Sequence, residues 1–248
     1  MLDNQDKNIV LKISGLHKSF GSKVILDNVN LSLHKNETVV VLGRSGTGKS
    51  VILKCIVGLI SPDSGTIEIN GKDTKNLTGE DLSNFRCDVG FLFQSGALYD
   101  SMSVRENLEF PVIRQNNYNG EDVTSKVVEQ LQNVSLADSI DKMPSELSGG
   151  MRKRIGLART LMLNPDIILY DEPTTGLDTF TSKEISTLIV KMKEKYGVSS
   201  IVITHDMPCA KMIADRIVVL KDGKFVAQGT YDELSQSPDD FIRSFFSY

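Results

Sequence analysis

One glycine-rich stretch constrains the fold of this chain more than any other feature. It reads GRSGTGKS over residues 43–50, and it lies between an apolar run, ETVVVLG, and a second one, VILKCIVGLI. A short buried strand, a glycine loop and a helix that is apolar around most of its circumference predict the opening of a βαβ unit. In that context the pattern G-x-x-x-x-G-K-S predicts a phosphate-binding loop at the start of the helix.

The predicted ligand of this loop is a nucleoside triphosphate with Mg²⁺. We expect Lys49 to reach the β- and γ-phosphates and the Ser50 hydroxyl to bind the metal ion, while backbone N–H groups point at the phosphates. A glycine-rich turn without a ligand is the alternative, which the strand and helix context disfavours. The expected nucleotide contacts are Gly43, Arg44, Ser45, Gly46, Thr47, Gly48, Lys49, Ser50 and Val51.

The remaining pattern predicts one α/β domain over residues 1–248. Two alternating runs joined around Gly21 and a turn at Asn70 and Gly71 indicate an N-terminal antiparallel β subdomain. Strand and helix patterns alternate again after residue 163, and they end in a hairpin at Asp222 and Gly223, which favours a P-loop NTPase core with a mainly parallel sheet. Apolar residues at helical spacing between residues 123 and 134, without a confident strand nearby, indicate an inserted α-helical subdomain over about 95–163.

Composition narrows the class of protein. The chain has 248 residues and a formal net charge of -4, so the basic surplus typical of general nucleic-acid binding is missing. The densest basic cluster is Arg-Lys-Arg at 152–154; a solvated helix face is its expected role, and a docking patch for a partner is the alternative. We therefore expect no nucleic acid among the partners.

Cysteine usage and hydropathy suggest a compartment. The three cysteines, Cys55, Cys87 and Cys209, are widely spaced and form no C-x-x-C pair, so neither a disulfide framework nor a zinc site is predicted. The polar N-terminus does not resemble a signal peptide, and no apolar stretch approaches the roughly 20 residues that span a bilayer. We therefore expect a cytosolic chain in a reducing compartment.

Polar residues at strand ends predict the rest of the catalytic site. Asp171 and Glu172 end the apolar strand IILYD, and His205 follows SSIVIT in the same way. In an open α/β sheet, ligands collect at the carboxyl ends of the strands. We expect Asp171 to bind Mg²⁺, Glu172 to orient and activate the attacking water, and His205 to connect the γ-phosphate, the water and Glu172. The alternative for the two carboxylates is that they cap the next helix.

Gln94 is ambiguous from local sequence. It follows the strand-like segment FLF, so its amide carbonyl could bind Mg²⁺ or the residue could simply end the strand. The two interpretations have about equal support.

The segment LSGG at 147–150 places two glycines at the start of a helix. Together with GRSGTGKS, Gln94, IILYDEP, TGLD at 175–178 and His205, in this order, it resembles the ATP-binding cassette (ABC) ATPases over nearly the whole chain. In that family this segment closes over the γ-phosphate of ATP bound to a second copy. The resemblance therefore implies that Ser148, Gly149 and Gly150 contact nucleotide across a dimer of this chain.

The resemblance also assigns roles to single residues. It makes Phe20 the aromatic ring stacked on adenine, where a core position is the alternative, and it makes Gln94 a metal ligand. It places Asp178 in the communication between the two nucleotide sites and makes His205 the switch residue. Met151 departs from the family pattern, in which glutamine is usual, and methionine cannot replace the hydrogen bonds of an amide.

Two further stretches resemble one branch of this family. The runs FQSGALYDSMSVRENLEFPV and MPSELSGGM are similar to the ATPase subunit of Mla/Mce-type phospholipid transporters of bacteria. That resemblance implies an integral-membrane permease dimer and an Mce-domain lipid-binding protein as partners, allows a small regulatory subunit, and places the chain on the cytoplasmic side of the inner membrane.

Other functions remain as alternatives. The ATPase of another ABC system, such as a small-solute importer or a lipoprotein-handling system, is the nearest. A soluble non-transport cassette would usually carry two cassettes or a long coiled coil, and a P-loop kinase or GTPase should lack LSGG. Whether the C-terminal ELSQSPDDFIRSFFSY packs on the core or on a partner is left open by the sequence.

Overall fold

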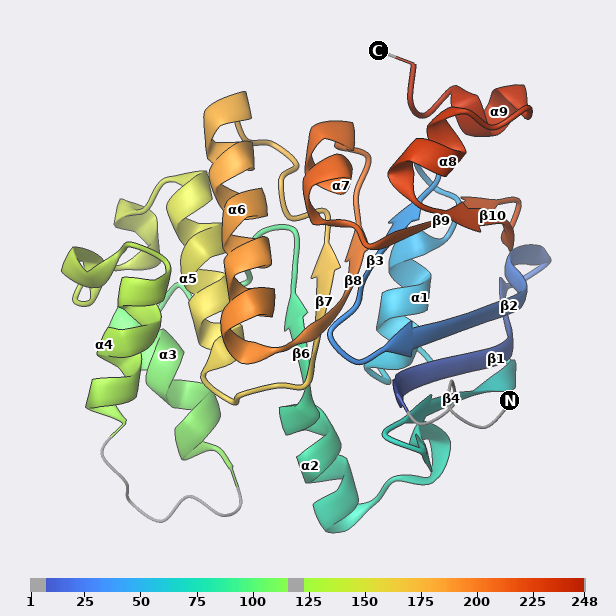
Figure 1. Cartoon of the computed structure of the whole chain (residues 1–248). Helices are drawn as coiled ribbons and strands as arrows, with labels where there is room; N and C mark the ends of the chain where they lie inside the picture. Colours follow the sequence, from blue (N-terminus) through green and yellow to red (C-terminus); the bar gives the residue numbers. More distant parts are fainter. Residues whose placement is uncertain (1–7, 116–122, 248) are drawn as a thin grey trace.

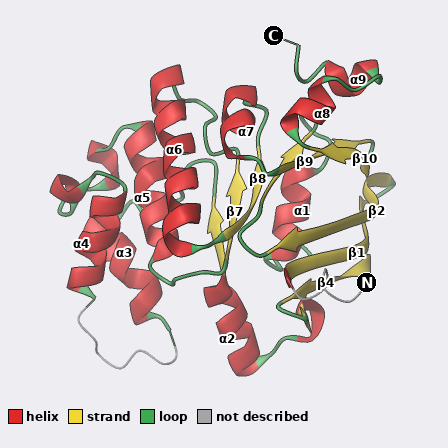
Figure 2. Cartoon of the chain, in the orientation of Figure 1, coloured by secondary structure: helices red, strands yellow, loops and turns green. Residues whose placement is uncertain are grey.

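A computed structural model describes residues 8–115 and 123–247 of the chain. Its strands form two sheets, one central and one at the N-terminal side, and helices flank both (Figure 1). The predicted α/β class is confirmed. The helix of residues 49–56 lies between the two sheets. The other face of the central sheet carries most of the remaining helices (Figure 2).

The central sheet has six strands in the order β10-β9-β3-β8-β7-β6. All neighbouring pairs are parallel except β9 with β10, which form the predicted hairpin at Asp222 and Gly223. The mainly parallel core is therefore confirmed. The strands are β3 (Thr38–Leu42), β6 (Val89–Leu92), β7 (Ile167–Asp171), β8 (Ser199–Ile203), β9 (Arg216–Lys221) and β10 (Lys224–Gly229).

Alternate side chains of the central strands enter two different cores. Val39 and Val41 pack with the antiparallel sheet and helix α1 (Lys49–Ile56), whereas Val40 and Leu42 pack with the helices on the opposite face. Strands covered on both faces are apolar without interruption, which is why ETVVVLG and IILYD read as buried strands.

The antiparallel sheet has the order β2-β1-β4-β5. Its long strands β1 (Ile9–Phe20) and β2 (Lys23–His34) pair directly, as the alternation predicted, and β4 (Ser64–Ile69) pairs with β1 and with β5 (Lys72–Asp73). The N-terminal antiparallel β subdomain and the turn at Asn70 and Gly71 are confirmed.

Helix α1 begins directly after the glycine loop and ends earlier than its apolar run suggests. It spans Lys49–Ile56, and the chain turns at Val57 and at Gly58, whose φ of 71° is outside the helical range. The sequence therefore overestimated this helix by four residues.

The remaining helices lie mostly on the other face of the central sheet. The periodicity between 123 and 134 correctly predicted α4, and the helix expected near 181–195 is α6. Helices α2 and α3 were not predicted individually. The bounds are α2 (Gly79–Asp88), α3 (Val104–Ile113), α4 (Thr124–Asn133), α5 (Gly149–Leu161), α6 (Thr179–Tyr196) and α7 (Met207–Ile213), with short 3₁₀ turns at Thr74–Asn76, Ala137–Ser139 and Pro144–Glu146.

The C-terminal segment packs on the core of its own chain. It forms α8 (Tyr231–Ser235) and α9 (Asp240–Arg243), which bury Leu234 and Ile242. The Tyr231 and Phe246 rings meet edge to face, with centroids 5.1 Å apart. Packing on the core is thus the outcome for the segment whose role the sequence left open.

Within residues 8–115 and 123–247, no helix combines the length and the apolar character needed to cross a bilayer.

Candidate functional site

Three adjacent strands of the central sheet end at the same level. Asp171 of β7 is in register with Ile203 of β8, which is in register with Val41 of β3. The loops after these strands therefore emerge side by side, and they carry the phosphate-binding loop, Glu172 and His205. The sequence predicted this meeting from the rule that parallel strands share one carboxyl edge.

The glycine loop is built to hold phosphate. Gly48 has a φ of 98°, and a Cβ atom there would lie 2.6 Å from Cγ2 of Ile25, so only glycine fits. The Lys49 ammonium donates hydrogen bonds to the carbonyl oxygens of Gly43 (2.8 Å) and Arg44 (3.1 Å). These bonds fold the lysine back over the loop, at the N-terminus of α1.

Burial lowers the pKa of the Lys49 ammonium, and the charges of Glu172 and Asp171 act in the opposite direction. Lys49 is almost completely buried. A cation held away from water beside a helix N-terminus suits a multiply charged anion such as a triphosphate.

Ser50 and Asp171 form the candidate magnesium site. The Ser50 hydroxyl donates a 2.8 Å hydrogen bond to Oδ1 of Asp171, across 121 residues of sequence. A hydroxyl and a carboxylate oxygen in contact match the hard oxygen ligands that Mg²⁺ prefers, with phosphate and water as its other ligands. The donor set fits the ion that the sequence predicted.

Gln94 lies outside this pair. It is exposed, two residues beyond the end of β6, and β6 is the neighbour of β7 in the sheet. Its position at the same sheet edge agrees with either interpretation that the sequence left open, so its role as a metal ligand stays a prediction.

Glu172 is held in a strained backbone conformation. Its φ is 52°, which is uncommon for a residue with a side chain, and its N–H donates to the Ile203 carbonyl at 2.9 Å. Strained backbone at a strand end often accompanies function. The conformation aims the carboxylate away from β7, towards the glycine loop and His205.

The Glu172 carboxylate has two side-chain partners. Its Oε2 accepts a 3.0 Å hydrogen bond from the Thr175 hydroxyl and lies 2.8 Å from Nδ1 of His205. Glu172 is largely buried, with 16% of its side chain exposed, whereas His205 is 65% exposed. The alternative role of capping the next helix is wrong, because Asp178 caps α6.

One pocket joins Phe20 to part of the glycine loop, and so contains half of the predicted nucleotide contacts. It has a volume of about 330 Å³ and extends from Phe20 to Glu172. Phe20 is 51% exposed, so the core position considered for it is excluded. The pocket is lined by Phe20, Ile25, Ser45, Gly46, Gly48, Lys49, Ser50, Val51 and Glu172.

The start of α5 is not part of that pocket. Ser148 caps the helix by accepting the Met151 N–H at 3.2 Å, and Ser148 and Gly149 are exposed. A Cβ atom at Gly150 would lie 2.4 Å from Cγ2 of Thr181, so this glycine is required by packing inside the chain. Packing inside the chain therefore explains Gly150 but not Gly149, and contact of these glycines with a nucleotide stays a prediction.

The Arg-Lys-Arg cluster is not a solvated helix face. Lys153 is buried, and its ammonium donates to the carbonyl oxygens of Thr175 (2.7 Å) and Glu172 (3.4 Å). The flanking Arg152 and Arg154 are partly exposed. Net charge in a run of basic residues does not show which side chain turns inward, and the expectation of a solvated face is wrong for Lys153.

Asp178 lies at the N-terminus of α6. Its carboxylate accepts hydrogen bonds from the Thr181 N–H (2.9 Å) and hydroxyl (2.6 Å). These bonds lower the pKa of the Asp178 carboxyl, with the hydroxyl contributing most. The residue is exposed, so contact with another molecule is open to it.

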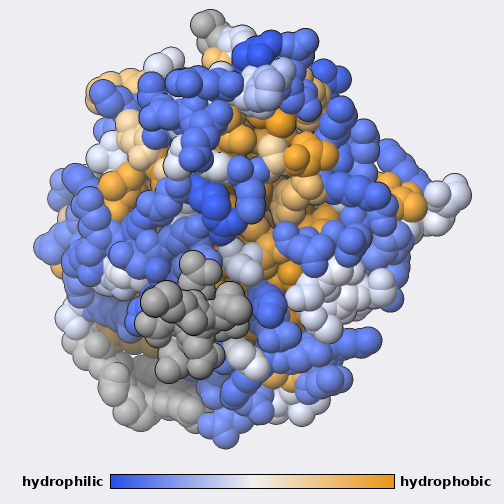
Figure 3. Space-filling view, turned by 45° about the vertical axis from the view of Figure 1, so that its right-hand side comes forward, coloured by the Kyte–Doolittle hydropathy of each residue, from blue (hydrophilic) through white to orange (hydrophobic). Residues whose placement is uncertain are grey.

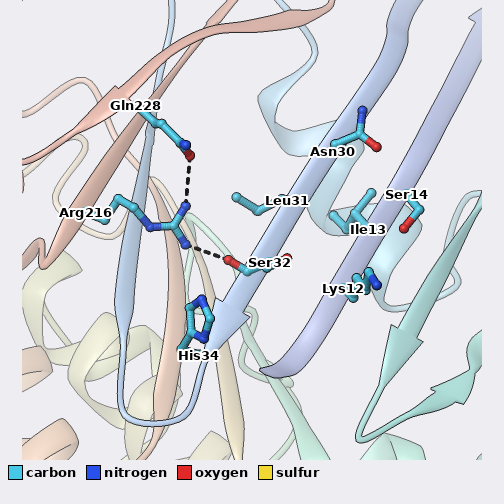
Figure 4. A pocket seen from close by; sticks show the side chains of 9 residues that line it. All are labelled: Lys12, Ile13, Ser14, Asn30, Leu31, Ser32, His34, Arg216 and Gln228. Carbon is cyan, nitrogen blue, oxygen red and sulfur yellow. Dashed lines mark hydrogen bonds between the residues drawn. The ribbon is translucent and has the colours of Figure 1, made fainter. Parts of the chain in front are cut away.

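A second, polar pocket of about 480 Å³ lies over β1, β2 and β9 (Figure 4). Its central cation, Arg216, is already bonded to Glu37 (2.7 and 3.1 Å), to the Ser32 carbonyl (2.6 Å) and to Gln228 (3.2 Å). Its charge is compensated within the chain, so this pocket is a weaker candidate than the one at the sheet edge.

Sequence reasoning missed three residues of the site. Ile25 lines the pocket from β2, Thr175 bonds the Glu172 carboxylate, and Lys153 supports the loop that carries Glu172. A signal existed only for Lys153: it lies three residues after Gly150 and four before Leu157, on the buried side of the helix.

Comparison with known proteins agrees with this geometry. The family model described as ABC transporter matches residues 26–175. The chain is 38% identical to the intermembrane phospholipid transport system ATP-binding protein MlaF of Haemophilus influenzae, over 93% of this chain and 87% of that protein. It is also 38% identical to a probable ribonucleotide transport ATP-binding protein of Mycobacterium leprae, over 96% of this chain and 69% of that one.

A solved structure shows the same fold. A dimeric ATP-binding cassette in a post-hydrolysis state, bound to ADP and phosphate, superposes with a TM-score of 0.79 at 34% identity, over 89% of this chain and 98% of that one. The protein cbiO1 of Clostridium perfringens, part of an ABC transporter complex, gives a TM-score of 0.81 at 27% identity, over 90% and 89%.

Proposed function

The chain belongs to the ABC transporter ATPases, and we propose that the transporter which it energises moves phospholipid. As a member of that family, it binds ATP with Mg²⁺ and hydrolyses the nucleotide. The cargo, the partner proteins and the role of each site residue belong to the proposal.

The residues at the sheet edge support a division of labour in hydrolysis. Lys49 and the loop N–H groups bind the phosphates, and Ser50 with Asp171 holds the metal ion, which neutralises charge on the reacting phosphate. Glu172 accepts a hydrogen bond from the attacking water and orients it. His205, on the exposed side of Glu172, holds that carboxylate through Nδ1.

A dimer of this chain completes each site. Ser148 and Gly149 are exposed at the start of α5 and lie outside the chain's own nucleotide pocket. A helix N-terminus with free N–H groups favours phosphate, and the cassette at 34% identity was solved as a dimer. The α5 start of one copy closes over the nucleotide held by the other, with Asp178 beside it.

The run at 93–112 is the observation that carries the phospholipid proposal. It resembles Mla/Mce-type ATPases, and its structure is a preformed surface. Asn107 is fully buried, accepts the Tyr99 N–H at 2.8 Å and donates to the carbonyl oxygens of Tyr99, Met102 and Ser103. These bonds fix the loop, on which the Tyr99 side chain remains 47% exposed.

The relatives do not agree on a cargo, and a lipid is one of those that their names give. Two of them carry a lipid in their names, MlaF and the chloroplastic protein Trigalactosyldiacylglycerol 3 of Arabidopsis thaliana, which is 38% identical over 97% of this chain. Others are named for ribonucleotide transport and methionine import. An ABC system for such solutes is the second candidate.

The expected assembly follows from the proposal. A permease dimer contacts the loop around Tyr99, an Mce-domain protein carries the lipid, and a small regulatory subunit is a further possible member. The chain then lies on the cytoplasmic side of the bacterial inner membrane. The helical subdomain over about 95–163 is the part that faces the permease. Figure 3 shows hydrophobic residues among hydrophilic ones in the middle of the face that it draws.

Purification of the tagged chain from its native membranes in mild detergent tests this assembly. We expect mass spectrometry to find a multi-span permease, an Mce-domain protein and bound phospholipid. Tyr99→Ala should reduce recovery of the permease, because removal of a central aromatic anchor costs about 2 kcal/mol, or roughly thirtyfold in affinity.

Val226→Ala is the matched control, since Val226 has the same exposed fraction of 47% but lies on β10. Recovery of a permease without an Mce-domain protein or phospholipid would retain the transporter and reject the lipid. A purely soluble set of partners would reject both.

A further inference from the structure

Lys153 is a buried cation at which the start of α5 meets the loop that carries Glu172. The side chain is 5% exposed, and burial lowers the pKa of its ammonium while the charge of Glu172 raises it. A charged group at such a place is costly unless its hydrogen bonds are made. The hydrogen bonds of Lys153 are to backbone carbonyls of the catalytic loop.

Those hydrogen bonds fix the two residues that position the catalytic carboxylate. The ammonium donates to the Thr175 carbonyl at 2.7 Å and approaches the Glu172 carbonyl at 3.4 Å. The Thr175 hydroxyl in turn donates to Oε2 of Glu172 at 3.0 Å. Lys153 therefore supports both the strained backbone of Glu172 and the partner of its carboxylate.

The same helix contacts the loop again at its first turn. Gly150 packs against the methyl group of Thr181, and Gly149 faces Leu177, whose nearest side-chain carbon would lie 3.7 Å from an added Cβ. Lys153 and the packing of Gly150 against Thr181 join the first two turns of α5 to residues 172–181. A rigid helix with several contacts transmits a small displacement of its end.

We propose that Lys153 is a positioning residue that connects the ATP contact at the start of α5 to the chain's own catalytic Glu172. Ser148 and Lys153 lie five residues apart on this helix. When the start of α5 engages nucleotide in the other copy, the ammonium shifts the 172–175 backbone with it and sets the direction of the Glu172 carboxylate. The connection across the dimer rests on the function proposed above, whereas the support of Glu172 does not.

Three substitutions separate the bonds of Lys153 from its bulk. Lys153→Met retains length and removes the donor, Lys153→Gln retains a neutral N–H donor, and Lys153→Arg retains the charge. Arg152→Met is the control, because it removes a charge from the neighbouring position, whose Nε donates to the Leu147 carbonyl and not to the 172–175 loop. All are measured in the assembly purified from native membranes.

We expect kcat for ATP hydrolysis to fall in the order wild type, Arg, Gln, Met. The Met variant should lose roughly tenfold or more, since small displacements of a catalytic group are costly. The affinity for a fluorescent ATP analogue should stay within about threefold, because Lys153 does not line the nucleotide pocket. The Hill coefficient for ATP should fall towards one, which a purely structural role would not produce.

Three results overturn the proposal. One is a Met variant with kcat within twofold of wild type, and another is a parallel loss of kcat and ATP affinity. If the Met variant does not fold, unchanged kcat in both the Gln and the Arg variants overturns it as well. A reduced kcat with an unchanged Hill coefficient retains the support of Glu172 and rejects only the link between copies.

Discussion

At the scale of single residues, burial decides which groups are reactive. Lys49 and Lys153 are both buried cations whose pKa is lowered by burial, and both donate to backbone carbonyls, Lys49 in the glycine loop and Lys153 in the loop that carries Glu172. Cys55 and Cys209 are buried as well, and burial raises the pKa of each thiol to about 11. The burial of a side chain therefore says more about its pKa than its residue type does.

The buried thiols give a test of this statement. At pH 8 a thiol with a pKa of about 11 is ionised in about one molecule in a thousand. We expect iodoacetamide to leave Cys55 and Cys209 unmodified in the folded chain and to alkylate both in urea, as measured by mass spectrometry. Equal labelling rates in the folded and unfolded chains would contradict their burial.

The same thiols predict how stability depends on pH. Unfolded thiols ionise near pH 8.5, and these two ionise near 11 when folded, so their contribution is complete below about pH 8.5 and is lost as pH rises towards 11. Urea unfolding at pH 8 and pH 10 should show a lower free energy of unfolding at the higher pH. Substitution of both cysteines by alanine should reduce that difference, and an unchanged difference would contradict the assignment.

At the scale of helices and strands, local sequence patterns predicted that an element exists better than they predicted where it begins and ends. Helix α4 follows its apolar period, and α6 begins within two residues of the expected start. Helix α1 ends four residues earlier than expected, because the apolar residues continue through the turn that follows it. Contacts between helices, such as that of α5 with α6, leave no local signal in either helix.

Gly150 provides the test at this scale. Gly150→Ala should destabilise the fold, because its methyl group would overlap Cγ2 of Thr181, and overpacking of this kind costs about 1–3 kcal/mol. Thermal unfolding should show a melting temperature lower by several degrees. Gly149→Ala, whose added carbon would make an ordinary 3.7 Å contact, is the matched control for stability.

A second substitution tests whether the Thr181 methyl group causes the lower stability expected for Gly150→Ala. Thr181→Ser removes the obstructing methyl group and retains the hydroxyl that bonds Asp178. It should restore stability to Gly150→Ala. Equal melting temperatures for the two alanine variants would show that the α5 start relaxes without cost.

At the scale of the whole molecule, the proposed function divides each nucleotide site between two copies of the chain. The pocket unites Phe20, the glycine loop and Glu172, whereas Ser148 and Gly149 at the start of α5 are exposed and do not line it. A dimer related by twofold symmetry would contain two identical composite sites. The residues of one site are then divided between chains, with Lys49 and Glu172 on one side and Ser148 on the other.

Mixing two inactive variants tests this division. Dimers of Lys49→Ala with Ser148→Arg contain one intact and one doubly damaged site, and random pairing gives activity of up to about a quarter of the wild type. Lys49→Ala mixed with Glu172→Gln is the control, because both residues serve the same half of the site and every site stays damaged. ATPase recovery in the control mixture, or none in the first, would contradict the composite arrangement.

The sequence by itself determined the sheet, the phosphate loop and the strand ends that carry Asp171, Glu172 and His205. Their signals are the hydrophobic pattern of each strand and the spacing of the motif residues, which neighbouring residues encode. Only the tertiary structure showed that Phe20 lines the pocket, that Lys153 turns inward, and that Gly150 makes room for Thr181. Ser50 and Asp171 meet across 121 residues, and contacts of that range arise only when packing brings distant segments together.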